Sequence, residues 1–375
     1  MHVLGPNELL EDVLRKGFCV SCGACVHLCP YFRAHRGRIA MPFSCDRETG
    51  RCHAFCPKTE VDLEELSQAV RGSAYSGEPA GQYRELFMAR ASEAVGKGEF
   101  QDGGTVSALI SYALDADWID SAVLTGRQGL VPAPGLATNS REVAEFSTSK
   151  YTAAPTLSSL NEGASRGFSR MGVVSTPCQS TAVAQMRSNP MQREDFKDPV
   201  ALSVGLFCTW ALDTRKLLAF IEERAPGQRI HKMRIPPPPA GILEVDTDEG
   251  TLEIPLEEIR SLVPEGCRIC PDMTSEWADI SVGAMEGYEG YNTLIARSDK
   301  GQRLIRDAAS AGYLVLEDFP SQSLKHLLQA AADKKRRAFR LASSKELLNN
   351  EEGRAALRVS PQALEQILAE EGGSE

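Results

Sequence analysis

The stretch that decides the N-terminal fold is Cys19-Val20-Ser21-Cys22-Gly23-Ala24-Cys25-Val26-His27-Leu28-Cys29-Pro30. Its four cysteines follow the spacing C-x2-C-x2-C-x3-C, and a proline follows the last of them. This spacing lets three thiolates on one tight turn hold three corners of a cubane iron–sulfur cluster, while the fourth typically serves a second cluster. A zinc site or a disulfide knot is the alternative, but zinc sites usually show two separated C-x2-C pairs. The unbroken run therefore predicts iron–sulfur ligation.

A second group of cysteines repeats the ending of this run. Cys45 is followed by Cys52 and by Cys56 with a proline after it, so the pattern C-x3-C-P occurs twice. In a two-cluster ferredoxin this repeat predicts two ligand sets, Cys19, Cys22, Cys25 and Cys56 on one cluster and Cys29, Cys45 and Cys52 on the other. The second run is incomplete, because Asp46 and Thr49 stand where a full repeat has cysteines. The second cluster could be a three-iron cluster, could use Asp46 or another non-cysteine ligand, or could be absent.

The composition narrows the class of protein. The chain has 375 residues, 42% of them hydrophobic and 25% charged, with a net charge of −10, which suggests two or three ordinary globular domains. It has no run of about 18 apolar residues and no secretory signal pattern, so we expect a cytoplasmic protein without a membrane span. The acidic balance argues against nucleic acid as a partner. In that setting the eleven cysteines indicate metal ligands rather than disulfides.

The chain divides by composition after the cysteine-rich residues. A Gly/Ser/Pro-rich stretch at 71–81 is typical of a linker, and strand-like and helix-like segments alternate over 82–345. We therefore predict a mixed α+β or α/β fold in three parts: a bacterial-ferredoxin-like module (1–75), an α/β domain (76–345) and a charged helical tail (346–375). The basic block Lys334-Lys335-Arg336-Arg337 is predicted to be a solvated helix face, with an ionic contact to a partner subunit or to an acidic cofactor tail as the alternative.

The four remaining cysteines follow predicted strands or stand in a loop. Cys178 comes just after a strand at 172–175, Cys208 ends a strand at 200–207, and Cys267 and Cys270 form a C-x2-C pair. The carboxyl ends of strands in open α/β sheets form the ligand-binding edge, so these thiols are expected to converge there. Four buried structural cysteines are the alternative.

Two short motifs in the α/β domain could bind a phosphate. Gly103-Gly104 precedes a predicted helix, where free backbone N–H groups and the helix dipole suit an anion, although an ordinary turn is the alternative. The pattern does not meet the dinucleotide fingerprint G-x-G-x-x-G. Lys150 and Tyr151 could pair with a phosphate and stack on a ring, or could be a solvated lysine beside a half-buried tyrosine.

Five motifs occur together in order: Gln101-Asp102-Gly103-Gly104, Lys150-Tyr151-Thr152, Thr176-Pro177-Cys178-Gln179, Cys267-x2-Cys270-x-Asp272 and Ala278-Asp279-Ile280-Ser281-x-Gly283. Over residues 83–340 the chain resembles the beta-subunit family of coenzyme F420-reducing hydrogenase and formate dehydrogenase. One departure is Ser175, which stands where the family has a glycine before Thr-Pro-Cys. Members of this family often carry an added ferredoxin module.

The resemblance implies cofactors and the residues that hold them. It implies an α/β FAD-binding domain with one [4Fe–4S] cluster on Cys178, Cys208, Cys267 and Cys270. It places the flavin at Gln101, Asp102, Gly103, Gly104, Thr105, Ser107, Lys150, Tyr151, Thr152, Thr176, Pro177 and Gln179. With the N-terminal module, two or three clusters are expected in total.

The expected function is that of an iron–sulfur flavoprotein subunit. It would move electrons between a partner of the formate dehydrogenase, hydrogenase or heterodisulfide reductase type and an acceptor such as coenzyme F420 or ferredoxin, with FAD converting single electrons into pairs. A stand-alone ferredoxin-dependent reductase of a small organic substrate and a non-catalytic iron–sulfur adaptor are the alternatives. No Ser/His/Asp or paired-carboxylate constellation predicts a catalytic side chain.

Overall fold

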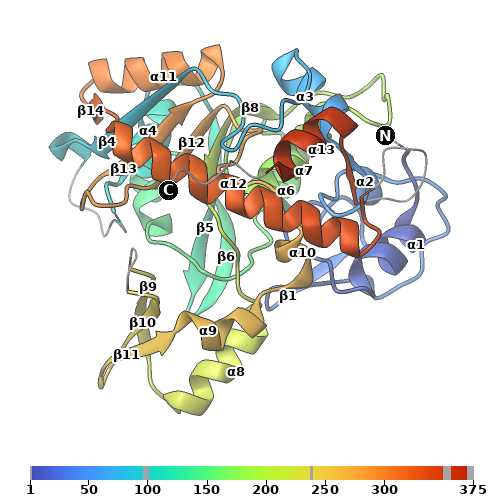
Figure 1. Ribbon diagram of the computed structural model, residues 1–375, viewed down its shortest axis with the longest axis horizontal. Helices are drawn as coiled ribbons and strands as arrows, with labels where there is room; N and C mark the ends of the chain where they lie inside the picture. The colour runs from blue at the N-terminus through green and yellow to red at the C-terminus, as the bar shows by residue number, and fades with distance from the viewer. Residues whose placement is uncertain (1, 96–99, 101, 237–239, 349–355, 370–375) are drawn as a thin grey trace.

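The computed structural model describes residues 2–95, 100, 102–236, 240–348 and 356–369. Its largest sheet consists of β4 (Glu85–Ala91), β5 (Ser121–Gln128), β6 (Val131–Ala137), β7 (Met171–Ser175), β8 (Val200–Leu206), β12 (Ile280–Ala284), β13 (Asn292–Ala296) and β14 (Leu314–Asp318). These eight strands are ordered β14-β4-β13-β12-β8-β7-β5-β6 (Figure 1). The neighbours β12, β8, β7 and β5 run parallel, and the outer pairs are antiparallel. The carboxyl ends of the parallel strands therefore share one edge, as the sequence predicts.

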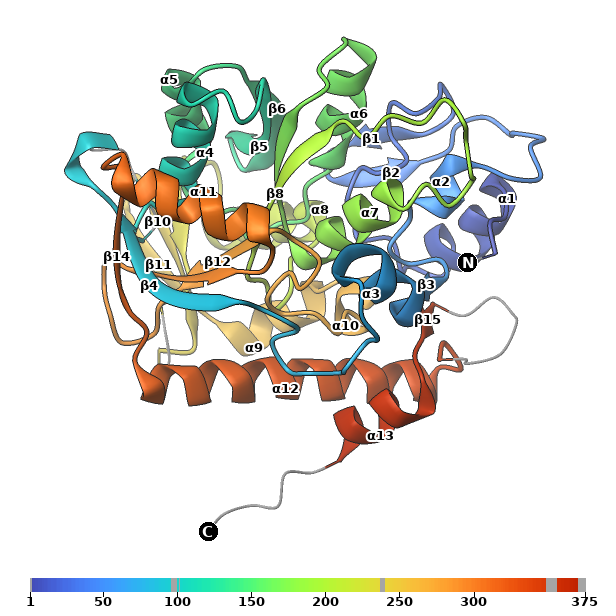
Figure 2. The same cartoon turned by 90° about the horizontal axis from the view of Figure 1, so that it is seen from above.

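Helices cover this sheet. They are α4 (Thr105–Asp115), α5 (Ser140–Val143), α6 (Leu157–Ser165), α7 (Pro177–Arg187), α11 (Asp299–Ser310) and α12 (Ser321–Ser344), with 3-10 turns η2 (Glu93–Val95) and η3 (Ala144–Phe146). A core of buried apolar side chains joins α4 and α11 to the sheet, and it includes Leu109, Ile110, Leu202, Leu294, Leu304 and Ile305. Figure 2 shows α12 running along the opposite side of the molecule from α11. The inner strands are mostly apolar because both faces of the sheet are covered, with buried serines at Ser175, Ser203 and Ser281.

The N-terminal module is short on regular structure. It contains α1 (Pro6–Leu9), the π-helical turn η1 (Leu10–Leu14), the antiparallel pair β1 (Arg33–His35) and β2 (Arg38–Ala40), α2 (Arg51–Ala54), β3 (Val61–Asp62) and α3 (Leu63–Arg71). The Asp62 carboxylate accepts the backbone N–H groups of Glu64 and Glu65, which fixes the start of α3. Gly72 ends this helix with φ +70°, a left-handed conformation that favours glycine.

The last described part of the chain packs onto this module. β15 (Leu357–Arg358) pairs parallel with β3, and α13 (Pro361–Leu368) packs on α12. One apolar core unites the module, the end of α12 and the last described residues, and it includes Leu9, Phe32, Phe339, Leu357 and Ile367. Tyr75 and Ala80, in the stretch predicted as a linker, are also buried. The division into three parts remains a prediction.

A smaller three-stranded sheet lies beside the main one (Figure 1). It comprises β9 (Ile230–Arg234), β10 (Ile242–Thr247) and β11 (Gly250–Pro255), with α8 (Thr214–Arg224), α9 (Leu256–Ile259), η4 (Arg260–Leu262) and α10 (Glu265–Arg268) nearby in sequence. β10 and β11 form an antiparallel hairpin, with pairing from Ile242 and Pro255 to Thr247 and Gly250. None of the described helices combines the length and apolarity that a bilayer-spanning helix needs.

Candidate iron–sulfur centres and cofactor site

All eleven cysteines lie in the described part of the chain, and each is a free thiol. A first group unites the four that the ferredoxin repeat predicts on one cluster, Cys19, Cys22, Cys25 and Cys56. Burial raises the pKa of Cys22 well above its ordinary value, and the neighbouring Cys56 raises it further. Burial acts in the same way on Cys25, with added repulsion from Cys22 and Cys19. Thiols that oppose one another's ionisation are close in space, and an iron–sulfur cluster, which binds thiolates, fits this donor set.

A second group, Cys29, Cys45 and Cys52, lies beside the first. Burial raises the pKa of Cys52 to about 11, and Cys29 and Cys45 raise it further. Cys52 also raises the pKa of Cys25, so the two groups are neighbours. Among the described residues, no three His, Cys, Asp or Glu side chains converge tightly enough to hold a single metal ion. The type of the second cluster, and Asp46 as its ligand, remain predictions.

The third group lies at the carboxyl edge of the sheet, as the strand ends predict. Cys178 is the second residue of α7, Cys208 follows β8, and Cys267 and Cys270 flank the end of α10. The pKa of Cys178 is raised to about 12, chiefly by burial and in smaller part by repulsion from Cys270 and Cys267. The Cys208 N–H donates to the carbonyl of Met273 at 2.9 Å, which ties the strand end to the loop after Cys270. The structure thus brings together the four cysteines that the resemblance assigns to one cluster.

The first and third groups are adjacent. Cys178 raises the pKa of Cys22, so thiols of the two groups are neighbours. The carbonyl of Cys22 accepts the Leu157 N–H of α6 at 3.0 Å. Gly23 has φ +85°, and a Cβ there would lie 2.4 Å from the carbonyl oxygen of Pro155, so only glycine fits. The three thiol groups therefore form a continuous series from the N-terminal module to the sheet edge.

The predicted glycine pair opens α4 at the same sheet edge. Gly104 is its N-cap with φ +72°, and a Cβ on Gly103 would lie 2.8 Å from the Asn292 side-chain oxygen. The Thr105 hydroxyl donates to the carbonyl of Ala89 at 3.2 Å, and the Thr105 N–H donates to Asn292 at 3.3 Å. Thr105 thus anchors the turn.

The other predicted residues of this motif are placed as follows. Asp102 precedes the glycine pair and is exposed as a residue, and partial desolvation of its carboxyl group raises its pKa. Ser107 is half-buried in the first turn of α4. Gln101 lies outside the described residues.

The predicted Lys150 motif runs along another part of this edge. Lys150 Nζ donates to the carbonyls of residues 146, 147 and 148, each at 2.7 Å. Burial lowers the pKa of Lys150 to about 8, although three carbonyl acceptors favour its charged form. The Tyr151 hydroxyl accepts the Ile235 N–H at 3.1 Å, and the Asp102 charge raises the pKa of Tyr151 after the larger effect of burial. Thr152 is buried and bridges to Leu212. The structure brings Asp102 and Tyr151 near each other.

The Thr176 motif orders the turn that carries Cys178. Thr176 caps α7, Pro177 is its first residue, and the Thr176 N–H donates to Gln179 Oε1 at 2.9 Å. Gln179 Nε2 donates to the carbonyl of Ala154 at 2.9 Å and to Thr156 Oγ1 at 3.0 Å. The start of α7 is therefore tied to the segment after Lys150–Thr152. The roles of all these residues at a flavin remain predictions.

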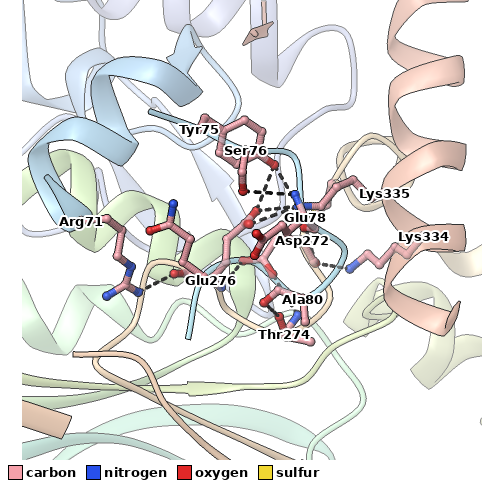
Figure 3. Close-up of polar contacts among 12 residues, drawn as sticks. Arg71, Tyr75, Ser76, Glu78, Ala80, Asp272, Thr274, Glu276, Lys334 and Lys335 are labelled. Carbon is pink, nitrogen blue, oxygen red and sulfur yellow. Dashed lines mark hydrogen bonds and ion pairs between the residues drawn. The ribbon is translucent and has the colours of Figure 1, made fainter. Parts of the chain in front are cut away.

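A buried network of polar side chains, centred on Lys335 and Glu276, was not predicted from the sequence (Figure 3). Lys334 and Lys335 are 5% and 1% exposed, so the prediction that their block is a solvated helix face is wrong for these two residues. Lys335 Nζ lies 3.1 Å from Glu276 Oε2 and donates to the Tyr75 hydroxyl at 2.9 Å. Lys334 Nζ donates to the carbonyls of Cys208 and Asp272, each at 2.6 Å. The available signal was spacing, because both lysines fall on the stripe of buried residues at 331, 338 and 342 on α12.

The fold and its grouped free thiols define a class of redox protein, an α/β oxidoreductase subunit. Two family models, both described as "Coenzyme F420 hydrogenase/dehydrogenase, beta subunit", agree with this class. The model of the N-terminal part matches residues 86–161, and the model of the C-terminal part matches residues 168–322. The chain belongs to the coenzyme F420 hydrogenase/dehydrogenase beta-subunit family, which confirms the resemblance. The cysteine-rich module at 18–60 and α12 beyond Gln322 lie outside both matches.

Individual relatives bear this out. The chain is 30% identical over 277 residues to the coenzyme F420 hydrogenase subunit beta of Methanothermobacter thermautotrophicus, covering 71% of this chain and 97% of that protein. It is 27% identical over 309 residues to the coenzyme F420-dependent sulfite reductase of Methanocaldococcus jannaschii, covering 79% of this chain and 46% of that protein. A chain in the structure of the F420-reducing [NiFe] hydrogenase complex from Methanosarcina barkeri matches with a TM-score of 0.64 and 27% identity, over 71% of this chain and 93% of that chain.

Proposed function

We propose that the chain is an iron–sulfur flavoprotein subunit that passes electrons between a partner redox enzyme and coenzyme F420 or ferredoxin. The observation that carries this proposal is the continuous series of three thiol groups, which ends at the sheet edge where the predicted flavin residues lie. The names of the relatives, hydrogenase and sulfite reductase dependent on coenzyme F420, support a deazaflavin as the two-electron acceptor. Partners of the formate dehydrogenase or heterodisulfide reductase type belong to the same proposal.

In this proposal the residues of the chain hold and insulate the cofactors. FAD, when bound, exchanges single electrons with clusters and electron pairs with the acceptor. The start of α4, with its glycine pair and the positive end of the helix dipole, would hold the diphosphate. Tyr151 and the turn at Thr176 would position the isoalloxazine ring of FAD. Gln179 holds these two segments together through its hydrogen bonds to Ala154 and Thr156. Each thiol group contains one buried cysteine, Cys22, Cys52 or Cys270, and the limited access of water favours cluster ligation over hydrolysis.

Electrons would enter or leave through the second thiol group in the N-terminal module. The β1–β2 hairpin, which lies between Cys29 and Cys45 in the sequence, exposes Arg33, Arg36 and Arg38, and none of the ion pairs among the described residues involves them. These three exposed guanidinium groups on an otherwise acidic protein would form a docking surface. The partner that fits it has an acidic surface around its own redox centre. Such a partner could be a fixed subunit or a soluble ferredoxin.

The test begins with anaerobic purification and measurement of iron, sulfide and flavin. Cys178→Ser should remove about four irons, the content of one cubane cluster, while Cys45→Ser should remove iron only from the second group. Reduction assays with coenzyme F420, ferredoxin and NAD(P) then identify the acceptor. Unchanged iron content in Cys178→Ser would refute the assignment of the third group. Flavins absorb at about 450 nm. A protein with full iron content but without this absorbance band would favour a non-catalytic adaptor.

The flavin site has a matched pair of variants. Gly104→Asp should lower FAD occupancy, because a carboxylate at the start of α4 repels phosphate. Gly104→Ala serves as the control, since a Cβ at this position, with φ +72°, meets the Phe100 ring at 2.7 Å in both variants. An equal loss of FAD in both would assign the effect to backbone strain, and normal occupancy in both would mean that the phosphates lie elsewhere. Turnover of an organic substrate by the lone chain would favour the stand-alone reductase.

A further inference from the structure

A lysine from a distant helix is bonded to the backbone of the third thiol group. Lys334 of α12 is 5% exposed. Its Nζ donates to the carbonyl of Asp272 (Figure 3) and to the carbonyl of Cys208, each at 2.6 Å. Both carbonyls belong to the segments that carry the third group, the end of β8 and the loop after Cys270. The lysine lies beyond the part of the chain that the family models match.

This ammonium forms no ion pair with a carboxylate in the described part of the chain, although the Asp272 carboxylate is among the nearby groups that act on it. None of the ion pairs found there includes Lys334, whereas its neighbour Lys335 pairs with Glu276. The Asp272 carboxylate accepts the N–H groups of Thr274 and Glu276, each at 2.9 Å. A buried charge without an opposite charge beside it is costly, even where carbonyl groups accept its hydrogen bonds, so a compensating negative charge is expected nearby. The third thiol group is placed to supply it, because one carbonyl partner of Lys334 belongs to Cys208 and the other lies two residues after Cys270.

Positive charge flanks this group from two directions. Lys58, which follows Cys56 and is also buried, acts on Cys178 and Cys267 from the N-terminal side. Lys334 acts on Cys208 and Cys267 from the side of α12, and it is also bonded to the backbone of the group. Lys334 is therefore held in a fixed position relative to the cysteines.

We infer that Lys334 raises the reduction potential of the cluster held by Cys178, Cys208, Cys267 and Cys270. The inference rests on the proposed function, because it requires a cluster at this group. One-electron reduction adds one negative charge to the group without a change in bonds or protons, and the electron comes from the neighbouring first group or the flavin. A fixed ammonium in a low-dielectric site stabilises the added charge and therefore the reduced state. Electrons would then favour the position next to the predicted flavin site.

The experiment compares four variants with the parent chain, purified anaerobically with cofactors in place. Lys334→Met removes the charge, Lys334→Gln removes it but keeps a hydrogen-bond donor, and Lys334→Arg keeps it. Arg337→Gln removes an exposed charge from the same helix and is the matched control. The readout is a redox titration followed by electron paramagnetic resonance, in which the signal missing from Cys178→Ser identifies the third group. Iron content is measured in parallel.

We expect the two neutral variants to weaken reduction of this cluster at least about tenfold, which is about 59 mV for one electron. Lys334→Arg and Arg337→Gln should stay within a few-fold of the parent. An unchanged potential in Lys334→Gln with full iron would overturn the inference and leave the proposed function intact. Loss of iron from both neutral variants, but not from Lys334→Arg, would also overturn it by showing a role in site assembly. Equal iron in the parent and Cys178→Ser would refute the proposed cluster and the inference together.

Discussion

The ion pair between Lys335 and Glu276 offers the sharpest test of how the chain is held together. The two side chains are 2% and 4% exposed, with Nζ 3.1 Å from Oε2. Lys335 also donates to the Tyr75 hydroxyl at 2.9 Å and to the carbonyl of Glu78 at 2.8 Å. The pair thereby joins three segments: α12, the loop after Cys270 and the stretch that follows the N-terminal module. Glu276→Gln keeps the shape of the side chain but leaves the ammonium buried without its negative partner.

The expected loss follows from this geometry. Removing one partner of a buried ion pair typically costs about 3–5 kcal/mol, because the other charge is left uncompensated. Two acceptors of Lys335 remain, so we expect about 3 kcal/mol, at the lower end of that range. Replacing both partners, with Glu276→Leu and Lys335→Met, removes both charges and should recover most of the loss, because apolar replacements of buried pairs are often close to neutral.

Urea unfolding under anaerobic conditions measures these differences. Trp277 lies beside Tyr75, with ring centroids 5.9 Å apart, so its fluorescence should report on this junction. The control is Asp195→Asn, which breaks a solvent-exposed pair with Arg193 and should leave the unfolding midpoint unchanged, since water screens such pairs. The reasoning is refuted if Glu276→Gln is as stable as the control, or if the double variant is no more stable than Glu276→Gln alone.

Three further predictions concern the cysteine module and the sheet edge. Gly23→Ala should cost about 2 kcal/mol or more through its left-handed backbone and its clash with Pro155, with iron lost first from the N-terminal groups; full iron and unchanged stability would contradict it. Changing Arg33, Arg36 and Arg38 to Gln should slow reduction by an acidic protein donor at low salt but not at high salt, as stopped-flow rates would show; equal rates at low salt would place docking elsewhere. Burial lowers the pKa of Lys150 to about 8, below the pKa of a lysine in the unfolded chain. Between these two pKa values the Lys150 side chain is protonated in the unfolded chain but largely neutral in the folded protein. Stability relative to Lys150→Met should therefore rise with pH across that window, and a flat difference would mean that the three carbonyls keep the ammonium charged.

Local spacing predicted what depends on local geometry. The run from Cys19 to Cys29 and the repeated C-x3-C-P assign the same groups that the fold brings together. The strand ends at Cys178 and Cys208 also converge as expected, because a parallel sheet places its carboxyl ends on one edge. The glycine pair opens α4 as predicted, although the Thr105 side chain turns toward the backbone of Ala89.

What escaped prediction depends on long-range packing. The burial of Lys334 and Lys335 was hidden because a basic block normally faces water, and only the fold brings carbonyls and a carboxylate to meet it. The contact of the first thiol group with the third could not be predicted either, since Cys22 and Cys178 are far apart in the sequence and only the fold brings them together. Spacing supplies only three cysteines for the second cluster, so it does not determine whether a fourth ligand exists or which residue it is.

The pairing of β15 with β3 has a consequence for how the protein is made. The cysteine module is synthesised early, yet Val61 and Asp62 receive their strand partner from Leu357 and Arg358, far later in the chain. A growing chain therefore leaves the ribosome before β3 can pair, and we expect the module to reach its final structure only after Leu357 and Arg358 have been translated. Truncations before Leu357 are expected to disturb metal loading at cysteines some three hundred residues upstream, as the register of the two strands implies.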